Sequence, residues 1–173
     1  MGLRRALTDP DIKRHLLREE GEVIVDEVRR HWIVYVVPVL EGLLAAGLLL
    51  LFPFAPMDIA WLPFLLAIAV GVHAWYKALS HYMDRFVITN MRVFRVNGVF
   101  SQQLATMPLT RILDITVKKP MHGRILGFGH FIFESAAQEQ GLRDIHFVGR
   151  PDARDLAIQR VVQRSGLRGP RVN

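Results

Sequence analysis

A charge-poor stretch constrains this chain more than any other feature. Between Trp32 and Tyr76 the sequence contains no Lys or Arg, and its only acids there are Glu41 and Asp58. The core of a soluble domain would not be one contiguous apolar block between densely charged flanks, whereas a membrane anchor has this pattern. The 173 residues therefore predict a membrane anchor joined to one small domain.

The apolar block divides into two segments, residues 32–54 and 59–79, separated by helix-breaking residues. At ~1.5 Å per residue, each segment is long enough for a hydrocarbon core of ~30 Å. Pro53, Pro56 and Asp58 make the connection short, so the two helices are expected to run antiparallel as a hairpin. The alternative is a buried hairpin of a soluble protein, which the length and uniform apolarity of both segments disfavour.

Positive charges indicate the orientation of this hairpin. Arg29 and Arg30 precede the first segment, Lys77 and Arg85 follow the second, and the connection at residues 53–58 has no basic residue. Lys and Arg resist translocation across the membrane. We therefore expect a multi-pass protein with both termini in the cytoplasm.

Both segments contain small residues at helix-packing intervals and a polar residue at similar depth. The predicted packing positions are Glu41, Gly42, Ala46, Ala67, Gly71, His73, Ala74 and Ala78. Small residues let helix backbones approach closely in lipid, although apolar helices are rich in them in any case. Glu41 and His73 are expected to form a hydrogen bond within the hairpin or to a partner subunit, rather than a proton path.

Short apolar runs separated by turn residues follow the hairpin and predict antiparallel strands. The predicted strands are residues 86–88, 93–96, 99–100, 112–117, 131–133 and 145–148. Asn97-Gly98 is a strong hairpin signal. Pro151 and Asp152 open an amphipathic helix.

The remaining segments give weaker predictions. Residues 11–20 suit a short helix, capped by Thr8 or Asp9 and stopped by Gly21, and residues 22–28 suit an extended piece. The predicted division is an N-terminal cytoplasmic segment 1–30, the hairpin 31–79, a domain 80–165 and a flexible tail 166–173.

Several short pieces of the sequence carry a family resemblance. They are Thr89-Asn90-Met91-Arg92, Gly98, Pro108-Leu109 with Ile112, Arg124-Ile-Leu-Gly127-Phe-Gly129 and Glu134-Ser-Ala136, after a hairpin entered through Arg29-Arg30-His31-Trp32. In this order, over residues 20–165, the chain resembles the bacterial membrane-associated PH-like domain family (bacterial PH family 2). The resemblance implies an α+β membrane protein of the bacterial inner membrane: a transmembrane helical hairpin followed by a PH-like small β-barrel capped by a C-terminal helix.

These motifs have a structural interpretation first. Thr89 and Asn90 suit a turn, and Gly127 and Gly129 suit a sharp bend where the barrel closes. A ligand-contacting role is the alternative.

Residues 80–173 contain fourteen basic and seven acidic residues, so the basic surplus belongs to the domain. Beside a bilayer, such a surplus indicates anionic headgroups, or else only a solvated surface. The candidate lipid or partner contacts are Arg92, Arg95, Arg111, Lys118, Lys119 and Arg124. No motif indicates nucleic acid.

No pattern typical of catalysis or metal binding is present in the sequence. There is no cysteine, and none of the histidines at positions 15, 31, 73, 81, 122, 130 and 146 stands at a recognised metal-ligand spacing. Gly127-Phe-Gly129 lacks the Lys and helix of a phosphate loop. The sequence therefore predicts no enzyme activity and no cofactor.

Two functions fit these observations. The first is an accessory or scaffolding subunit that packs its hairpin against other membrane protein subunits or further copies of itself. The alternative is an anionic-lipid-binding module that senses or organises the membrane surface. The lipid bilayer is an expected partner in both.

Overall fold

The computed structural model describes residues 12–135, 142 and 144–164. The chain divides into two compact units. One is a helical hairpin, Trp32–Tyr82, and the other is a domain formed by the residues on both sides of it, Met1–His31 and Met83–Asn173.

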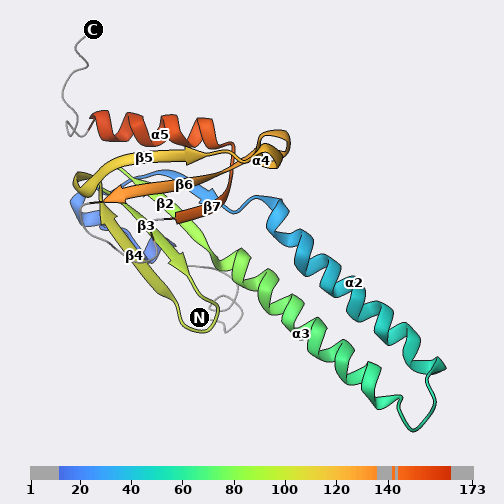
Figure 1. The fold of residues 1–173 in the computed structure, drawn as a ribbon. Helices are drawn as coiled ribbons and strands as arrows, with labels where there is room; N and C mark the ends of the chain where they lie inside the picture. Colours follow the sequence, from blue (N-terminus) through green and yellow to red (C-terminus); the bar gives the residue numbers. More distant parts are fainter. Residues whose placement is uncertain (1–11, 136–141, 143, 165–173) are drawn as a thin grey trace. The chain divides into compact units, whose positions relative to one another are not determined.

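The hairpin consists of two helices, which run antiparallel (Figure 1). Helix α2 (Val36–Leu51) lies between two 3-10 turns, Trp32–Tyr35 and Phe52–Phe54, and helix α3 spans Trp61–Met83. The segments Trp32–Phe54 and Trp61–Met83 are long and apolar enough to cross a membrane, judged by length and composition. Helix α3 runs beyond the predicted end at residue 79, since Ser80 to Met83 continue the same helix before the next strand begins.

Among its described residues, the domain contains two antiparallel sheets and two further α-helices. Figure 1 shows how they are arranged. The first sheet has the order β1 (Ile24–Arg29), β2 (Arg85–Thr89), β3 (Arg92–Asn97) and β4 (Gln103–Pro108). The second has the order β5 (Ile112–Lys118), β6 (Phe128–Ser135) and β7 (Asp144–Gly149). Helix α4 (Met121–Leu126) connects β5 to β6, and helix α5 (Pro151–Arg164) follows β7. Short 3-10 turns lie at Ile12–His15, Arg18–Glu20 and Leu109–Arg111.

The main core lies between the two sheets and α5. Phe86 from the first sheet packs with Phe133 from the second, and Ile158 from α5 belongs to the same buried cluster. A second cluster lies on the opposite face of the first sheet, where Phe94 of β3 is covered by Ile12 and Leu16 of the N-terminal turns. Strand β2 is therefore buried on both faces, which explains its continuous apolar run.

Strand β1 precedes the hairpin in sequence, yet it forms the edge of the first sheet. It pairs antiparallel with β2, and Val28 lies opposite Phe86. The sequence-based division placed residues 1–30 outside the domain, whereas β1 lies within this sheet. The hairpin thus occupies the connection between two neighbouring strands.

Two predictions about the sheets need correction. The strands do not close into a barrel, because the 3-10 turn Leu109–Arg111 separates β4 from β5 and the strands form two sheets. Residues 99–100 are not a strand, because Gly98 adopts a φ of 103° and begins a longer turn. The hairpin signal at Gly98 therefore gives the correct pairing of β3 with the following chain, but β4 begins only at Gln103.

Other sequence predictions have mixed outcomes. The C-terminal amphipathic helix is confirmed as α5. The helix over residues 11–20 is wrong, since the described part of that stretch forms two 3-10 turns that end before Gly21, whose φ is 77°. Thr8, Asp9 and the tail at 166–173 lie outside the described residues.

Candidate functional site

Three ionisable side chains meet between the helices of the hairpin. The Oε2 atom of Glu41 lies 3.0 Å from Nδ1 of His73, and Nζ of Lys77 donates to Oε1 of Glu41 at 3.1 Å. The Glu41–His73 contact expected within the hairpin is present. Lys77 was not predicted to join it, although its position one helical turn after His73 is a signal that sequence reasoning could have used.

Small residues form the contact between α2 and α3. Ala67 and Ala74 of α3 are buried, and a Cβ at Gly71 would lie 3.7 Å from the Cβ of Ala45 in α2. Ala46 is exposed and its neighbour Ala45 is buried instead, because the helix turns Ala45 toward α3.

One side of the hairpin contains an open groove of about 280 Å³. Four of the predicted packing residues line it: Gly42, Gly71, Ala74 and Ala78. Tyr35 and Trp75 also contribute to its lining. Small residues of the hairpin thus line this open groove as well as the contact between α2 and α3.

A network of ion pairs lies in the domain at the point where the chain enters and leaves the hairpin. Arg30, just before the hairpin, donates from Nε to Oδ2 of Asp84, just after it, at 2.6 Å. Arg95 of β3 donates to both oxygens of Asp84, from two nitrogens at 2.8 Å each. These contacts hold together two chain segments that the hairpin separates by 54 residues.

The electrostatics of this network favour its charged form. Burial alone would raise the pKa of Asp84, but the hydrogen bonds and positive charges of Arg95 and Arg30 outweigh burial and lower it below its ordinary value of 3.8. The hydrogen bond to Asp84 correspondingly raises the pKa of Arg95. Asp84 is therefore a stably ionised carboxylate between two guanidinium groups.

A second network explains the Thr89-Asn90-Met91-Arg92 motif. Arg92 donates from Nε and Nη2 to the carboxylate of Glu22 at 2.9 and 3.1 Å, and the Thr89 hydroxyl bonds the same carboxylate at 2.8 Å. The Asn90 side chain accepts from the backbone N–H of Val23 and donates to the carbonyl of Gly21. The motif thus connects the β2–β3 turn to the chain before β1.

The carboxylate of Glu22 has no exposed surface. Burial would raise the pKa of Glu22, but hydrogen bonds from Arg92, the backbone N–H of Leu17 and Thr89 lower it below its ordinary value. The fold-determining interpretation of this motif therefore has a direct structural basis.

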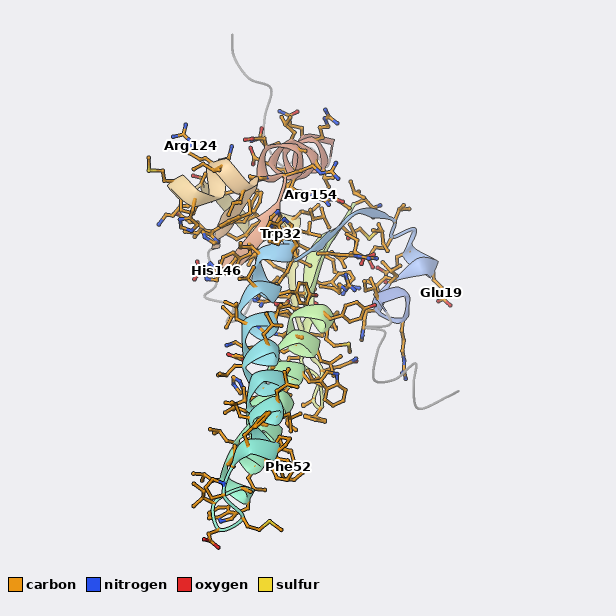
Figure 2. All side chains as sticks on the ribbon, turned by 90° about the vertical axis from the view of Figure 1, so that its right-hand side faces the viewer. Glu19, Trp32, Phe52, Arg124, His146 and Arg154 are labelled. Carbon is orange, nitrogen blue, oxygen red and sulfur yellow. The ribbon has the colours of Figure 1, made fainter. Side chains whose placement is uncertain are left out.

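The structure separates the six basic residues that were candidates for lipid or partner contact. Arg92 and Arg95 are largely buried in the two networks, so their charges are neutralised inside the domain. Lys119 forms an ion pair with Asp152. Arg111, Lys118 and Arg124 are exposed, and Figure 2 shows Arg124 on the outer side of α4.

Histidine and aromatic side chains form a cluster around β6 and β7. Nδ1 of His146 lies 3.3 Å from Nδ1 of His130, and the backbone N–H of Phe147 donates to the same atom of His130 at 3.1 Å. Phe147 has a φ of 58°, an uncommon conformation for a bulky residue. Burial is the main cause that lowers the pKa of His130, and the nearby His146 and His122 lower it further.

The surroundings of α4 are not a phosphate loop. Gly127 ends α4 with a φ of 79°, and its N–H donates to the carbonyl of Gly123. Gly129 lies in β6, where a Cβ would come within 3.0 Å of Pro151. Only the first of these glycines therefore marks a bend, and the second is required by close packing against the start of α5.

Two small cavities lie in the core of the domain. The two cavities lined by Val28, Phe86, Ile145 and Val148 have about 10 Å³ each, enough for about one water molecule. Among the described residues, no group of three or more His, Asp or Glu is arranged to hold a metal ion.

The profile of a known family matches most of this chain. The family is described as Bacterial PH domain, and the matched residues are 33–166, which include both apolar helices and the domain from β2 to α5. No curated protein and no solved structure matches the chain. Because the match covers more than half of the 173 residues and agrees with the resemblance of the sequence motifs, the chain belongs to the bacterial PH domain family.

Proposed function

We propose that the chain is a non-enzymatic membrane protein of the bacterial inner membrane, an accessory or scaffolding subunit whose hairpin anchors a PH-like contact domain. The observation that carries this proposal is the place of the hairpin. It joins β1 to β2, two neighbouring strands of one sheet, so the domain would be tied to the bilayer by two chain segments.

The surface of the hairpin supports membrane insertion. Leu43, Leu50 and Trp75 are among many large apolar side chains that it exposes, and water is an unfavourable environment for them. The cluster of Glu41 with His73 and Lys77 compensates the one acid of α2, as an ionisable group in a bilayer requires.

Cysteine labelling tests insertion and orientation, since the chain has no native cysteine. Met57→Cys, in the exposed connection between the helices, should react with an impermeant maleimide in intact spheroplasts. Gln102→Cys, exposed in the domain, should react only after lysis. The opposite pattern would contradict the cytoplasmic position of the domain, and release of the chain from membranes at alkaline pH would contradict insertion.

Co-purification tests the subunit role. A Cβ at Gly42 or Gly47 would meet no atom within 4 Å, but only Gly42 is among the residues that line the groove. Gly42→Leu would therefore fill the groove without disturbing the hairpin, and should release partner proteins in mild detergent. Gly47→Leu should retain them. Equal recovery of partners with both variants would contradict a role of the groove in assembly.

A second candidate function is binding of anionic lipid headgroups. One observation favours it: Lys118 and Arg124 are exposed, whereas Arg92 and Arg95 are neutralised inside the domain.

A further inference from the structure

The connection between β5 and β6 exposes two large apolar side chains on a short, well-fixed helix. Met121 and Ile125 of α4 are 83% and 81% exposed. They are four residues apart, so they lie on the same face of the helix. Leu126 next to them is partly exposed. In water this arrangement is unfavourable, and it needs an explanation other than core packing.

Helix α4 is held firmly against the domain. A Cβ on the buried Gly123 would lie 2.5 Å from the carbonyl oxygen of Phe128, so the helix backbone packs directly on β6. The His122 ring contacts the Phe128 ring, with 5.4 Å between the two ring centroids. The N–H of Arg150 donates to the carbonyl of Gly127 at the end of the helix. The two apolar side chains are therefore presented on a fixed support.

Basic residues surround this apolar face. Lys118 precedes the helix, Arg124 lies within it, and Arg150 is hydrogen-bonded to its end; all three are exposed. From Ile115 to Phe133 the sequence contains no Asp or Glu. Asp152, an acid close to the start of α4 through its contact with Lys119, forms an ion pair with that lysine. The face is thus apolar at its centre and positively charged at its edge.

We propose that α4 contacts an anionic lipid surface, with Met121 and Ile125 entering the acyl region and Lys118, Arg124 and Arg150 at the headgroups. Apolar side chains flanked by bases match the two layers of such a surface, apolar below and negatively charged above. This inference rests on the proposed function, since the hairpin would keep the domain beside a bilayer.

Fluorescence quenching in vesicles tests the inference with the full chain. Three leucines are replaced singly by Cys and labelled with a fluorophore: Leu126 in α4, Leu156 in α5 and Leu50 in α2, all exposed or partly exposed. The chain is reconstituted into vesicles of phosphatidylcholine, alone or mixed with phosphatidylglycerol, that contain a spin-labelled phospholipid as the quencher. Labelling at position 126 leaves the side chains of both Met121 and Ile125 in place.

The expected result is strong quenching of the Leu126 label in the mixed vesicles and weak quenching of the Leu156 label. Replacing both Met121 and Ile125 by Ser should abolish the difference between the two positions. Arg124→Gln should lower the equilibrium constant for lipid contact about five-fold, and added salt should have the same direction of effect.

Several results would overturn the inference. They are equal quenching at Leu126 and Leu156, quenching at Leu126 that is independent of phosphatidylglycerol and of Arg124, and no quenching at Leu126. Shielding of Leu126 from a soluble quencher in native membranes but not in lipid vesicles would also overturn it, in favour of a protein partner. The Leu50 label separates the two proposals: if it is not quenched, the hairpin is not in the bilayer and the proposed function itself fails.

Discussion

The hairpin and the domain place their large and small apolar residues in opposite ways. In the domain, large side chains such as Phe94, Phe128 and Phe133 are fully buried. In the hairpin, Ala45, Ala67 and Ala74 are buried while many leucines are exposed. Burial of large apolar side chains stabilises a fold in water, but lipid is as apolar as leucine, and close packing of small residues has to hold helices together there.

Both regions also contain a carboxylate between two basic side chains, in different settings. Asp84 in the domain lies between Arg30 and Arg95, and Glu41 in the hairpin lies between His73 and Lys77. This difference between the regions is the one expected for a hairpin in lipid, as proposed, and a domain in water. Substitutions in each unit test that difference.

The largest effect is expected from removing β1 from the domain. A fragment of residues 83–165 lacks the strand that pairs with β2 and contributes Val28 to the core, so it should fail to fold. The same fragment joined through a short glycine-serine linker to residues 12–31 should be soluble and β-rich by circular dichroism. Equal folding of both fragments would show that β1 is dispensable and that the domain begins after the hairpin.

Asp84→Ala should be the most damaging single substitution in the domain. It leaves Arg30 and Arg95 without their carboxylate, and breaking such a buried pair lowers the free energy of unfolding by about 3–5 kcal/mol. Denaturant unfolding of the linked fragment measures this. Asp152→Ala removes an exposed ion pair with Lys119 and should change stability by less than about 1 kcal/mol. Similar losses in both variants would contradict the central role of Asp84.

Gly71→Leu should disturb the hairpin through packing. The Cβ of residue 71 would be in ordinary contact with Ala45 at 3.7 Å, but a leucine side chain would push the helices apart at a cost of about 1–3 kcal/mol. Gly71→Ala should be tolerated for the same reason. Thermal unfolding of the full chain in detergent compares the two. A fully stable Gly71→Leu hairpin would mean that the small residues are only apolar filler.

Glu41→Leu should be milder than Gly71→Leu. It removes the hydrogen bonds to His73 and Lys77, and polar contacts between membrane helices contribute about 1 kcal/mol or less. The same detergent unfolding assay measures the loss. A greater loss than that of Gly71→Leu would indicate that the hairpin depends on its polar cluster more than on close packing, contrary to the comparison above.

The smallest effect is expected from the pH dependence of the domain. The pKa of His130 is lowered in the folded state, mainly by burial, so folding favours its neutral form. Its contribution to stability is therefore present above its ordinary pKa of 6.5 and is lost as the pH falls below that value. His31, whose pKa burial also lowers, acts in the same direction.

Unfolding of the linked fragment between neutral and mildly acidic pH measures this effect. His130→Gln should flatten the profile in this range. Asp84 and Glu22 lose their contributions only at lower pH, because their folded-state pKa values lie below the ordinary ones of 3.8 and 4.5. An unchanged profile in His130→Gln would assign the acid sensitivity to other groups.

The sequence by itself determined the elements whose signals are local. Two long apolar segments predicted α2 and α3, short apolar runs predicted β2, β3, β5, β6 and β7, and amphipathic periodicity predicted α5. Hydrophobic period and length are properties of consecutive residues, so they can be read without a fold. Strand β4 and helix α4 were missed because Gln103–Pro108 has a single buried side chain and Met121–Leu126 is shorter than a periodic signal requires.

Only the tertiary structure decided which residues meet. Arg92 and Arg95 are indistinguishable from surface bases in the sequence, because their partners Glu22 and Asp84 do not lie on the same strand or helix. Glu22 is 70 residues from Arg92, and Arg30 is 54 residues from Asp84. Contacts over such separations depend on the pairing of β1 with β2 across the inserted hairpin, and no local pattern of residues encodes that pairing.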